Sequence, residues 1–210
     1  MIYTEDQLIE GLLKQEADAY RYAVKNYHAA MIKLSRAIVG DAFAEEVVQE
    51  AWISIIKGLS NFQRRSTLKT WIFRIVSNTA KTRIKKESKY KKISYEQSFT
   101  EQDDENYRSS SELQWHLDTP EAIIGSHELR QHIQFSFDHL PAMQQAVLTL
   151  NDIEGLSTSD ICSVLNITEN NARVLVHRAR LSIRKAICEY QCGLETKVTR
   201  NSDSSVTDIF

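Results

Sequence analysis

The sequence comprises 210 residues, of which 42% are hydrophobic and 26% are charged, and its net charge is −2. This length allows one or two domains with buried cores, and the composition is that of an ordinary globular protein. No apolar run reaches the roughly 18 residues that a membrane span needs, and the acidic, amphipathic start does not resemble a secretory signal.

The chain contains only two prolines and six glycines, so we expect an all-α fold. Three cysteines form no dense disulfide framework, which favours the cytoplasm. Residues 57–92 hold twelve Lys or Arg and one acid, residues 96–130 hold nine acids and two arginines, and residues 173–185 hold five bases and no acid. Two separate cationic segments on a nearly neutral protein indicate two contacts with one polyanion.

Four helices are predicted in the first half of the chain. Residues 4–40 contain two of them, and Gly40 is expected to end the second. The third lies within residues 41–62, and the fourth follows a short polar loop at residues 63–66. Apolar residues three and four positions apart define the buried faces of these two helices: Ala44, Val47, Val48, Ala51, Ile55 and Leu59 in the third, and Leu68, Ile72, Ile75, Val76, Ala80 and Ile84 in the fourth.

The second half begins with a polar, acidic stretch that we interpret as a linker. After it we expect a helix capped by Thr119 with Pro120 at its first position, and then a helix that ends near Gly155. Two further helices are expected to begin at Ser157 and Thr168. We therefore predict two small helical domains at residues 1–95 and 128–190, a linker at 96–127 and a disordered tail at 191–210.

The last two helices have the spacing of a helix-turn-helix, whose second helix enters the major groove of DNA. Arg173, His177, Arg180 and Arg184 lie on one face of this helix and aliphatic residues on the other. The absence of acids from Arg173 to Lys185 favours DNA binding, although a charged face on a helical bundle is often only solvated.

The fourth helix carries a second cationic face. Phe62 and Trp71 could stack on unpaired bases beside these cations, but Trp71 also lies on the apolar side, where it would pack in the core. Asn78 could contact a base edge or simply be solvated. On the third helix, an acidic strip next to Trp52 and Ile56 suits a basic, partly apolar protein partner, and solvation alone is again the alternative.

Two segments together resemble a known family. "DAFAEEVVQEAWISIIKGLSNFQRRSTLKTWIFRIVSNTAKTRIKK" resembles region two of the small extracytoplasmic-function sigma factors of bacteria, and "LPAMQQAVLTLNDIEGLSTSDICSVLNITENNARVLVHRARLSIRKAI" resembles their region four. The likeness covers roughly residues 20–92 and 140–187, in the family's order. It implies a protein that binds core RNA polymerase and directs promoter recognition, strand opening and transcription initiation, with a possible anti-sigma factor as a further partner.

The resemblance also assigns residues. It implies that the acidic strip, Glu45, Glu46, Gln49 and Glu50, contacts core polymerase. It implies that the melted non-template strand of the minus-ten element meets Arg64, Arg65, Ser66, Lys69, Arg74, Asn78 and Lys81. The duplex minus-thirty-five element would meet Arg173, Val174, His177, Arg178 and Arg180.

Some positions depart from the family pattern. Val174 and Leu175 stand where polar residues are frequent, so Val174 would touch a thymine methyl group or one contact would be absent. Asn166 stands at a turn position where the family often has glycine. This departure is small because Asn tolerates a left-handed backbone. Cys188 and Cys192, with Cys162 or His177, could bind metal or sense oxidation, but their irregular spacing favours packing or tail roles.

The main alternative is a helix-turn-helix regulator that binds DNA without recruiting polymerase. It leaves the acidic strip and the first cationic face without a role. We find no phosphate-binding glycine loop and no paired catalytic set, so we expect neither enzymatic activity nor a cofactor.

Overall fold

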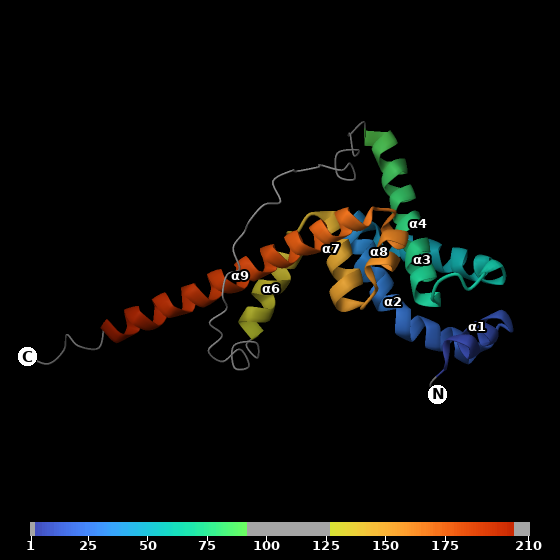
Figure 1. The fold of residues 1–210 in the computed structure, drawn as a ribbon, viewed down its shortest axis with the longest axis horizontal. Helices are drawn as coiled ribbons and strands as arrows, with labels where there is room; N and C mark the ends of the chain where they lie inside the picture. Colours follow the sequence, from blue (N-terminus) through green and yellow to red (C-terminus); the bar gives the residue numbers. More distant parts are fainter. Residues whose placement is uncertain (1–2, 92–126, 204–210) are drawn as a thin grey trace, which may run out of the picture. The chain divides into compact units, whose positions relative to one another are not determined.

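The computed structural model describes residues 3–91 and 127–203, and the side chains of residues 3–87 and 127–190. Within these ranges the regular elements are all helical, which confirms the all-α prediction (Figure 1). They are α1 (Glu5–Leu13), α2 (Ala17–Val39), α3 (Asp41–Gly58), the 3-10 turn η1 (Leu59–Asn61), α4 (Leu68–Lys91), α6 (His127–Asp138), α7 (Ala142–Leu148), the π-helical turn η3 (Thr149–Ile153), α8 (Thr158–Leu165) and α9 (Glu169–Asp203).

Several predictions fall outside these ranges. The predicted linker at residues 96–127, apart from His127, lies outside the described residues, as does the helix start predicted at Thr119 and Pro120. The segment predicted as a tail contains the end of α9, which continues to Asp203. None of the helices in the described part of the chain is long and apolar enough to cross a membrane.

The described residues form two compact units. The first contains residues 3–91 and 141–176, and the second contains residues 127–140 and 177–203. The first unit therefore combines the helices before the predicted linker with α7, η3, α8 and the start of α9.

The core of the first unit follows the predicted periodicity. All six apolar residues expected to be buried in the third helix are buried, five of them on α3 and Leu59 at the start of η1. On α4, Leu68, Ile72, Val76 and Ala80 are buried, whereas Ile75 and Ile84 are half-buried at the margin of the core. Spacings of three and four place these side chains on one face of each helix, so the two helices pack against α2 and against each other.

Local sequence also explains where the helices begin and end. Thr4 caps α1 and forms a reciprocal capping box with Gln7. Gly40 separates α2 from α3 with a φ of 78°, a backbone conformation that a side chain would strain, and so ends α2 as predicted. The helix predicted to run as far as Gly155 instead becomes the π-helical turn η3 after Leu148.

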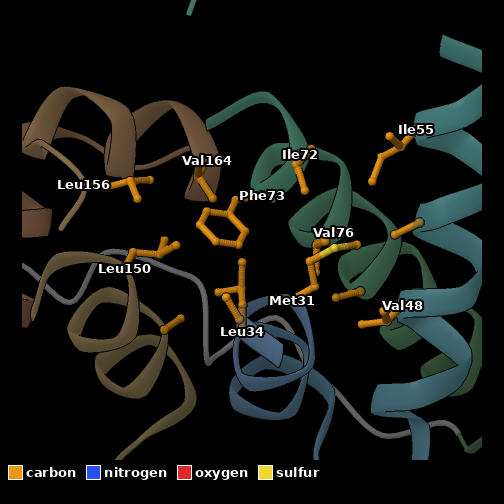
Figure 2. Packing of buried hydrophobic residues seen from close by; sticks show 14 of the residues in the cluster. Met31, Leu34, Val48, Ile55, Ile72, Phe73, Val76, Leu150, Leu156 and Val164 are labelled. Atoms are coloured by element: carbon orange, nitrogen blue, oxygen red, sulfur yellow. The ribbon is translucent and has the colours of Figure 1, made fainter. Parts of the chain in front are cut away.

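Phe73 joins the two sequence segments of the first unit. Its ring is fully buried on α4. Figure 2 shows it among Leu34 of α2, Leu150 of η3 and Val164 of α8, with Leu156 close by. Helices before and after the predicted linker thus share one hydrophobic core.

The second unit is built from α6 and the later part of α9. Leu129, Ala179 and Ala186 are buried in it. The rings of His132 and Tyr190 lie 5.6 Å apart, and the Tyr190 hydroxyl donates a hydrogen bond to Glu128 at 3.1 Å. Both contacts join Tyr190 of α9 to the first half of α6.

Candidate nucleic-acid and protein interfaces

The predicted polymerase-binding strip lies on the outer side of α3. Glu45, Glu46, Gln49 and Glu50 are all exposed, because they alternate with the buried residues of the same helix. Glu46 accepts a hydrogen bond from Arg83 of α4 at 2.8 Å, and the Arg83 guanidinium also lies 4.5 Å from the centre of the Phe43 ring. One acid of the strip is therefore tied to α4.

Exposed apolar side chains extend this strip. Ile53 and Ile56 are 53% and 50% exposed, one and two turns beyond Gln49 on α3. Trp52 is half-buried, and its indole nitrogen donates to Nδ1 of His28 on α2 at 3.2 Å. The strip thus combines carboxylates with exposed aliphatic surface, which suits a basic and partly apolar partner.

The aromatic residues before and within α4 pack on each other. The rings of Phe62 and Trp71 lie 5.1 Å apart, and both are partly buried against the core. A Cβ atom at Gly58 would lie 3.4 Å from the Trp71 ring, so the indole also covers the end of α3. This arrangement agrees with the interpretation of Trp71 as a packing residue.

Helix α1 holds the loop before α4 in place. Arg64 has a φ of 54° and forms an ion pair with Asp6 at 2.5 Å. The carboxylate of Glu5 accepts a hydrogen bond from the backbone N–H of Leu68 at 3.1 Å, which satisfies one amide at the start of α4. Arg65 is exposed and Ser66 is half-buried in the same loop.

The outer face of α4 carries three of the predicted minus-ten residues. Arg74, Asn78 and Lys81 line a hollow of about 350 Å³ together with Thr82 and Lys85, and Ser163 of α8 and Asn166 directly after it complete its wall. Burial lowers the pKa of Lys81, and the nearby charge of Lys85 lowers it further. The hollow is therefore a crowded cationic surface on which an anion would relieve repulsion.

Two lysines of α4, Lys69 and Lys81, contact the segment that runs from Glu154 to the end of α8. Lys69 Nζ lies 2.9 Å from Glu154 Oε2 and donates to the Glu154 carbonyl at 2.6 Å. Beside it, the Thr70 hydroxyl donates to Asp160 at 3.1 Å. Lys81 Nζ donates to the carbonyl of Leu165.

The turn between α8 and α9 has the predicted caps. Ser157 accepts a hydrogen bond from the backbone of Asp160 at 3.2 Å, and Thr168 accepts one from Asn171 at 3.3 Å. Asn166 ends α8 in the left-handed conformation with φ 55° and ψ 54°. The expectation that Asn could replace glycine at this turn is confirmed.

Along α9, the predicted minus-thirty-five residues include exposed and partly exposed side chains. Arg173, His177 and Arg180 are exposed, and Val174 and Arg178 are half-buried. The Arg173 guanidinium lies 2.5 Å from Glu169 one turn earlier. Ala172 and Ala179 are buried on the opposite side, so this helix has the apolar and cationic faces predicted from its spacing.

Comparison with known proteins gives two matches in the same order along the chain. Residues 23–90 match Sigma-70 region 2, and residues 131–183 match Sigma-70, region 4. The chain is 30% identical over 184 residues to the RNA polymerase sigma-H factor of Pseudomonas aeruginosa, covering 87% of this chain and 93% of that protein. It is 28% identical over 180 residues to the ECF RNA polymerase sigma-E factor of Escherichia coli K12, covering 86% and 92%.

The chain belongs to the extracytoplasmic-function sigma factors.

Solved structures with a similar fold are also found. One is the sigma factor RpoE in complex with the anti-sigma factor NepR from Bartonella quintana, with a TM-score of 0.55 and 18% identity, covering 80% of this chain and 96% of that one. Another is CnrH in complex with the cytosolic domain of CnrY, with a TM-score of 0.53 and 16% identity, covering 88% and 97%. These likenesses concern the fold of the sigma factor.

The structure adds residues that sequence reasoning did not select. Ile53 could have been found from its position one turn beyond Gln49. Glu154 and Asp160 could not, because they contact α4 residues 85 and 90 positions away and belong to no motif that predicts such a contact.

Among the described side chains, the cysteines do not lie in a group of residues that could bind a metal ion. In that part of this sigma factor, no group of three or more His, Cys, Asp or Glu could hold a metal ion. Burial raises the pKa of the Cys162 thiol, with a further contribution from Glu169, which disfavours the reactive thiolate. The side chain of Cys192 lies outside the described residues.

Proposed function

We propose that this sigma factor binds core RNA polymerase through α3, captures the melted minus-ten element on α4 and binds the duplex minus-thirty-five element with α9. Sigma factors direct transcription initiation and are not enzymes. The observation that carries the proposal is the presence of three chemically distinct surfaces on one chain that matches both sigma regions in order.

For the polymerase contact, we assign Glu45, Glu46, Gln49 and Glu50, with Ile53 and Ile56 as the apolar part of the surface. Carboxylates would repel nucleic acid, so a protein partner explains this strip better than DNA does. The exposed isoleucines provide apolar area that becomes buried on binding.

For the minus-ten element, we assign the predicted loop and helix residues: Arg64, Arg65, Ser66, Lys69, Arg74, Asn78 and Lys81. Cations would follow the phosphates, and the Asn78 amide would contact a base edge. Binding the unpaired strand more tightly than the duplex would favour strand separation, and no covalent bond forms or breaks.

For the minus-thirty-five element, we assign Arg173, Val174, His177, Arg178 and Arg180. Arginine pairs with the acceptor atoms of guanine in the major groove, and a valine methyl can contact that of thymine. The ion pair between Arg173 and Glu169 would have to exchange for a contact with DNA.

The proposed site of action is the cytoplasm, where a factor of this kind meets polymerase and chromosomal DNA. An anti-sigma factor is a further candidate partner. The similar solved structures include complexes of sigma factors with the anti-sigma factor NepR and with the cytosolic domain of CnrY.

Run-off transcription with core polymerase on a library of genomic fragments tests the proposal. Wild-type protein should yield start-site-specific transcripts, and Glu50→Lys should lose both core binding in a pull-down and transcription without a change in its melting curve. Glu10→Lys, which reverses an exposed acid on α1, is the matched control and should behave as wild type. A chain that binds promoter DNA but never co-elutes with core polymerase would instead be a DNA-binding regulator.

A further inference from the structure

Helix α1 contacts the proposed minus-ten surface at two points that are distant from it in the sequence. Asp6 Oδ1 lies 2.5 Å from Arg64 Nη1, and Glu5 Oε1 accepts the backbone N–H of Leu68 at 3.1 Å. These pairs are separated by 58 and 63 positions along the chain. Helix α1 precedes residues 23–90, which match Sigma-70 region 2, so that match assigns it no role.

The loop between η1 and α4 has a backbone that its own residues do not favour. Arg64 has a φ of 54°, in the left-handed region, where a Cβ atom crowds the following carbonyl oxygen. Glycine occupies this region readily, whereas arginine does so at a cost. An interaction outside the loop is needed to offset this strain, and the ion pair with Asp6 acts at the strained residue itself.

Glu5 acts at the other end of the same loop. The first amides of a helix have no partner within that helix. At the start of α4, the Glu5 carboxylate accepts the N–H of Leu68, and the Thr67 hydroxyl accepts that of Thr70. A carboxylate at this place also interacts favourably with the positive end of the helix dipole. Glu5 therefore joins α1 to the turn of α4 that carries Lys69.

Helix α1 is a firm base for both contacts. Leu8, Ile9 and Leu12 are buried in the core of the first unit. The capping box between Thr4 and Gln7 fixes the first turn of α1, where both acids lie. The two carboxylates are therefore presented to the loop by a helix that packing and capping hold in place.

Charge favours an intact ion pair while DNA is bound. The side chains of Arg64 and Asp6 are 53% and 72% exposed, so solvent and DNA can reach both. A strand that took Arg64 away from Asp6 would leave an unpaired carboxylate next to its own phosphates, and like charges repel. This repulsion opposes the exchange, so the pair contributes through the shape that it gives the loop.

We propose that Asp6 and Glu5 are positioning residues for minus-ten recognition. They hold residues 63–66 and the first turn of α4 in the shape that receives the unpaired strand, and Arg64 acts through this loop without contacting DNA. The inference rests on the proposed function for the assignment of this surface to the minus-ten element. It refines that assignment, because the strand would contact Arg65 and Lys69 while Arg64 stays paired with Asp6.

Hydrogen exchange in the free chain tests the hold on the loop. Asp6→Arg replaces the ion pair with two cations, so the amides of residues 63–68 should exchange several-fold faster at low salt, as measured by mass spectrometry. Combining Asp6→Arg with Arg64→Asp restores the pair with its charges exchanged, and aspartate tolerates a left-handed backbone better than arginine does. In this swapped pair, exchange should return to within about two-fold of wild type.

Two further variants complete this experiment. Glu5→Ala should accelerate exchange at Leu68, because it removes the acceptor of that amide. Glu10→Arg reverses another exposed acid of α1 and is the matched control, which should exchange as wild type. Unchanged exchange in Asp6→Arg, or no recovery in the swapped pair, overturns the proposal.

Promoter opening by the holoenzyme tests the consequence for DNA. Core polymerase with each variant is placed on the promoter that gives the strongest run-off transcript, and permanganate reactivity of unpaired thymines is measured. Asp6→Arg makes the surface more positive, so charge alone would strengthen DNA binding. A misplaced loop should instead lower the reactivity by about two- to five-fold. Core binding in a pull-down and the melting curve should stay as in wild type.

The swapped pair distinguishes a positioning role of Arg64 from a direct contact. If Arg64 acts through the loop, the swapped pair should recover most of the lost reactivity. If Arg64 contacted the strand, an aspartate in its place would repel the phosphates, and the reactivity would stay low. Wild-type or higher reactivity in Asp6→Arg, or no recovery in the swapped pair, contradicts the proposal.

These outcomes are separable from failure of the proposed function. Wild-type run-off transcription reports on sigma activity whatever the role of α1. If transcripts form but Asp6→Arg changes neither exchange nor promoter opening, the positioning role is rejected and the sigma function stands. If wild-type protein forms no transcripts from any template, the proposed function fails, and the positioning role falls with it.

Discussion

Replacing Phe73 with alanine should destabilise the first unit more than any change on its surface. The ring is completely buried, and it contacts residues from α2, η3 and α8 (Figure 2). Truncation removes roughly 100 Å² of apolar surface from the core, or about 2.5 kcal/mol at about 25 cal/mol per Å². A residual cavity on the order of 80 Å³ adds about 2 kcal/mol at about 24 cal/mol per Å³. Together these two terms lower the expected free energy of unfolding by about 4.5 kcal/mol.

Urea denaturation followed by tryptophan fluorescence measures this change. A Trp115→Phe background leaves Trp52 and Trp71 as the reporters, and both belong to the first unit. Phe135→Ala, which removes a ring that is 62% exposed on α6, is the control and should change stability by less than about 0.5 kcal/mol. A loss of less than about 1 kcal/mol for Phe73→Ala would refute the burial of this ring between the two sequence segments.

Four further outcomes are expected. Arg180→Ala should weaken duplex promoter binding and reduce the slope of log affinity against log salt by about one; an unchanged slope would separate this residue from DNA. Asn78→Ala should preserve duplex binding but lower permanganate reactivity of unpaired thymines, whereas wild-type reactivity would count against its assignment. Burial lowers the pKa of Lys81, so the charged side chain destabilises the folded chain at any pH below that lowered pKa, and this cost disappears as the pH rises to the unfolded pKa of 10.5. The stability of wild type relative to Lys81→Met should therefore increase between these two pKa values in thermal melts of both proteins. A stability difference that stays constant with pH would refute this. Asn166→Ala should cost about 1 kcal/mol and Asn166→Gly far less, because only the alanine is strained at φ 55°; equal melting curves would contradict the left-handed cap.

Sequence periodicity was sufficient to predict the helices that carry the three proposed surfaces. The buried faces of α3 and α4 repeat at three and four residues, so their opposite faces had to be exposed unless another segment covered them. The caps at Ser157 and Thr168 were also predictable from the sequence, because each capping hydrogen bond joins residues only three positions apart. The family assignment showed the order of the two sigma regions and suggested the roles proposed for their surfaces.

The local backbone was less predictable where two geometries compete. A single helix was expected as far as Gly155, but the chain changes to a π-helical turn at Thr149–Ile153. Leu150 is buried in this turn beside Phe73, so packing selects a backbone that residue propensities do not indicate.

The helices, their cationic and apolar faces and the caps of the helix-turn-helix follow from residues near one another in the chain. The contacts of α4 with Glu154 and Asp160 do not follow from nearby residues. Lys69 contacts Glu154 and Thr70 contacts Asp160 across 85 and 90 positions, in the unit where Phe73, Leu150 and Val164 share one core. Such contacts depend on closing a long stretch of chain, and no short sequence pattern encodes which distant carboxylate will face a given lysine.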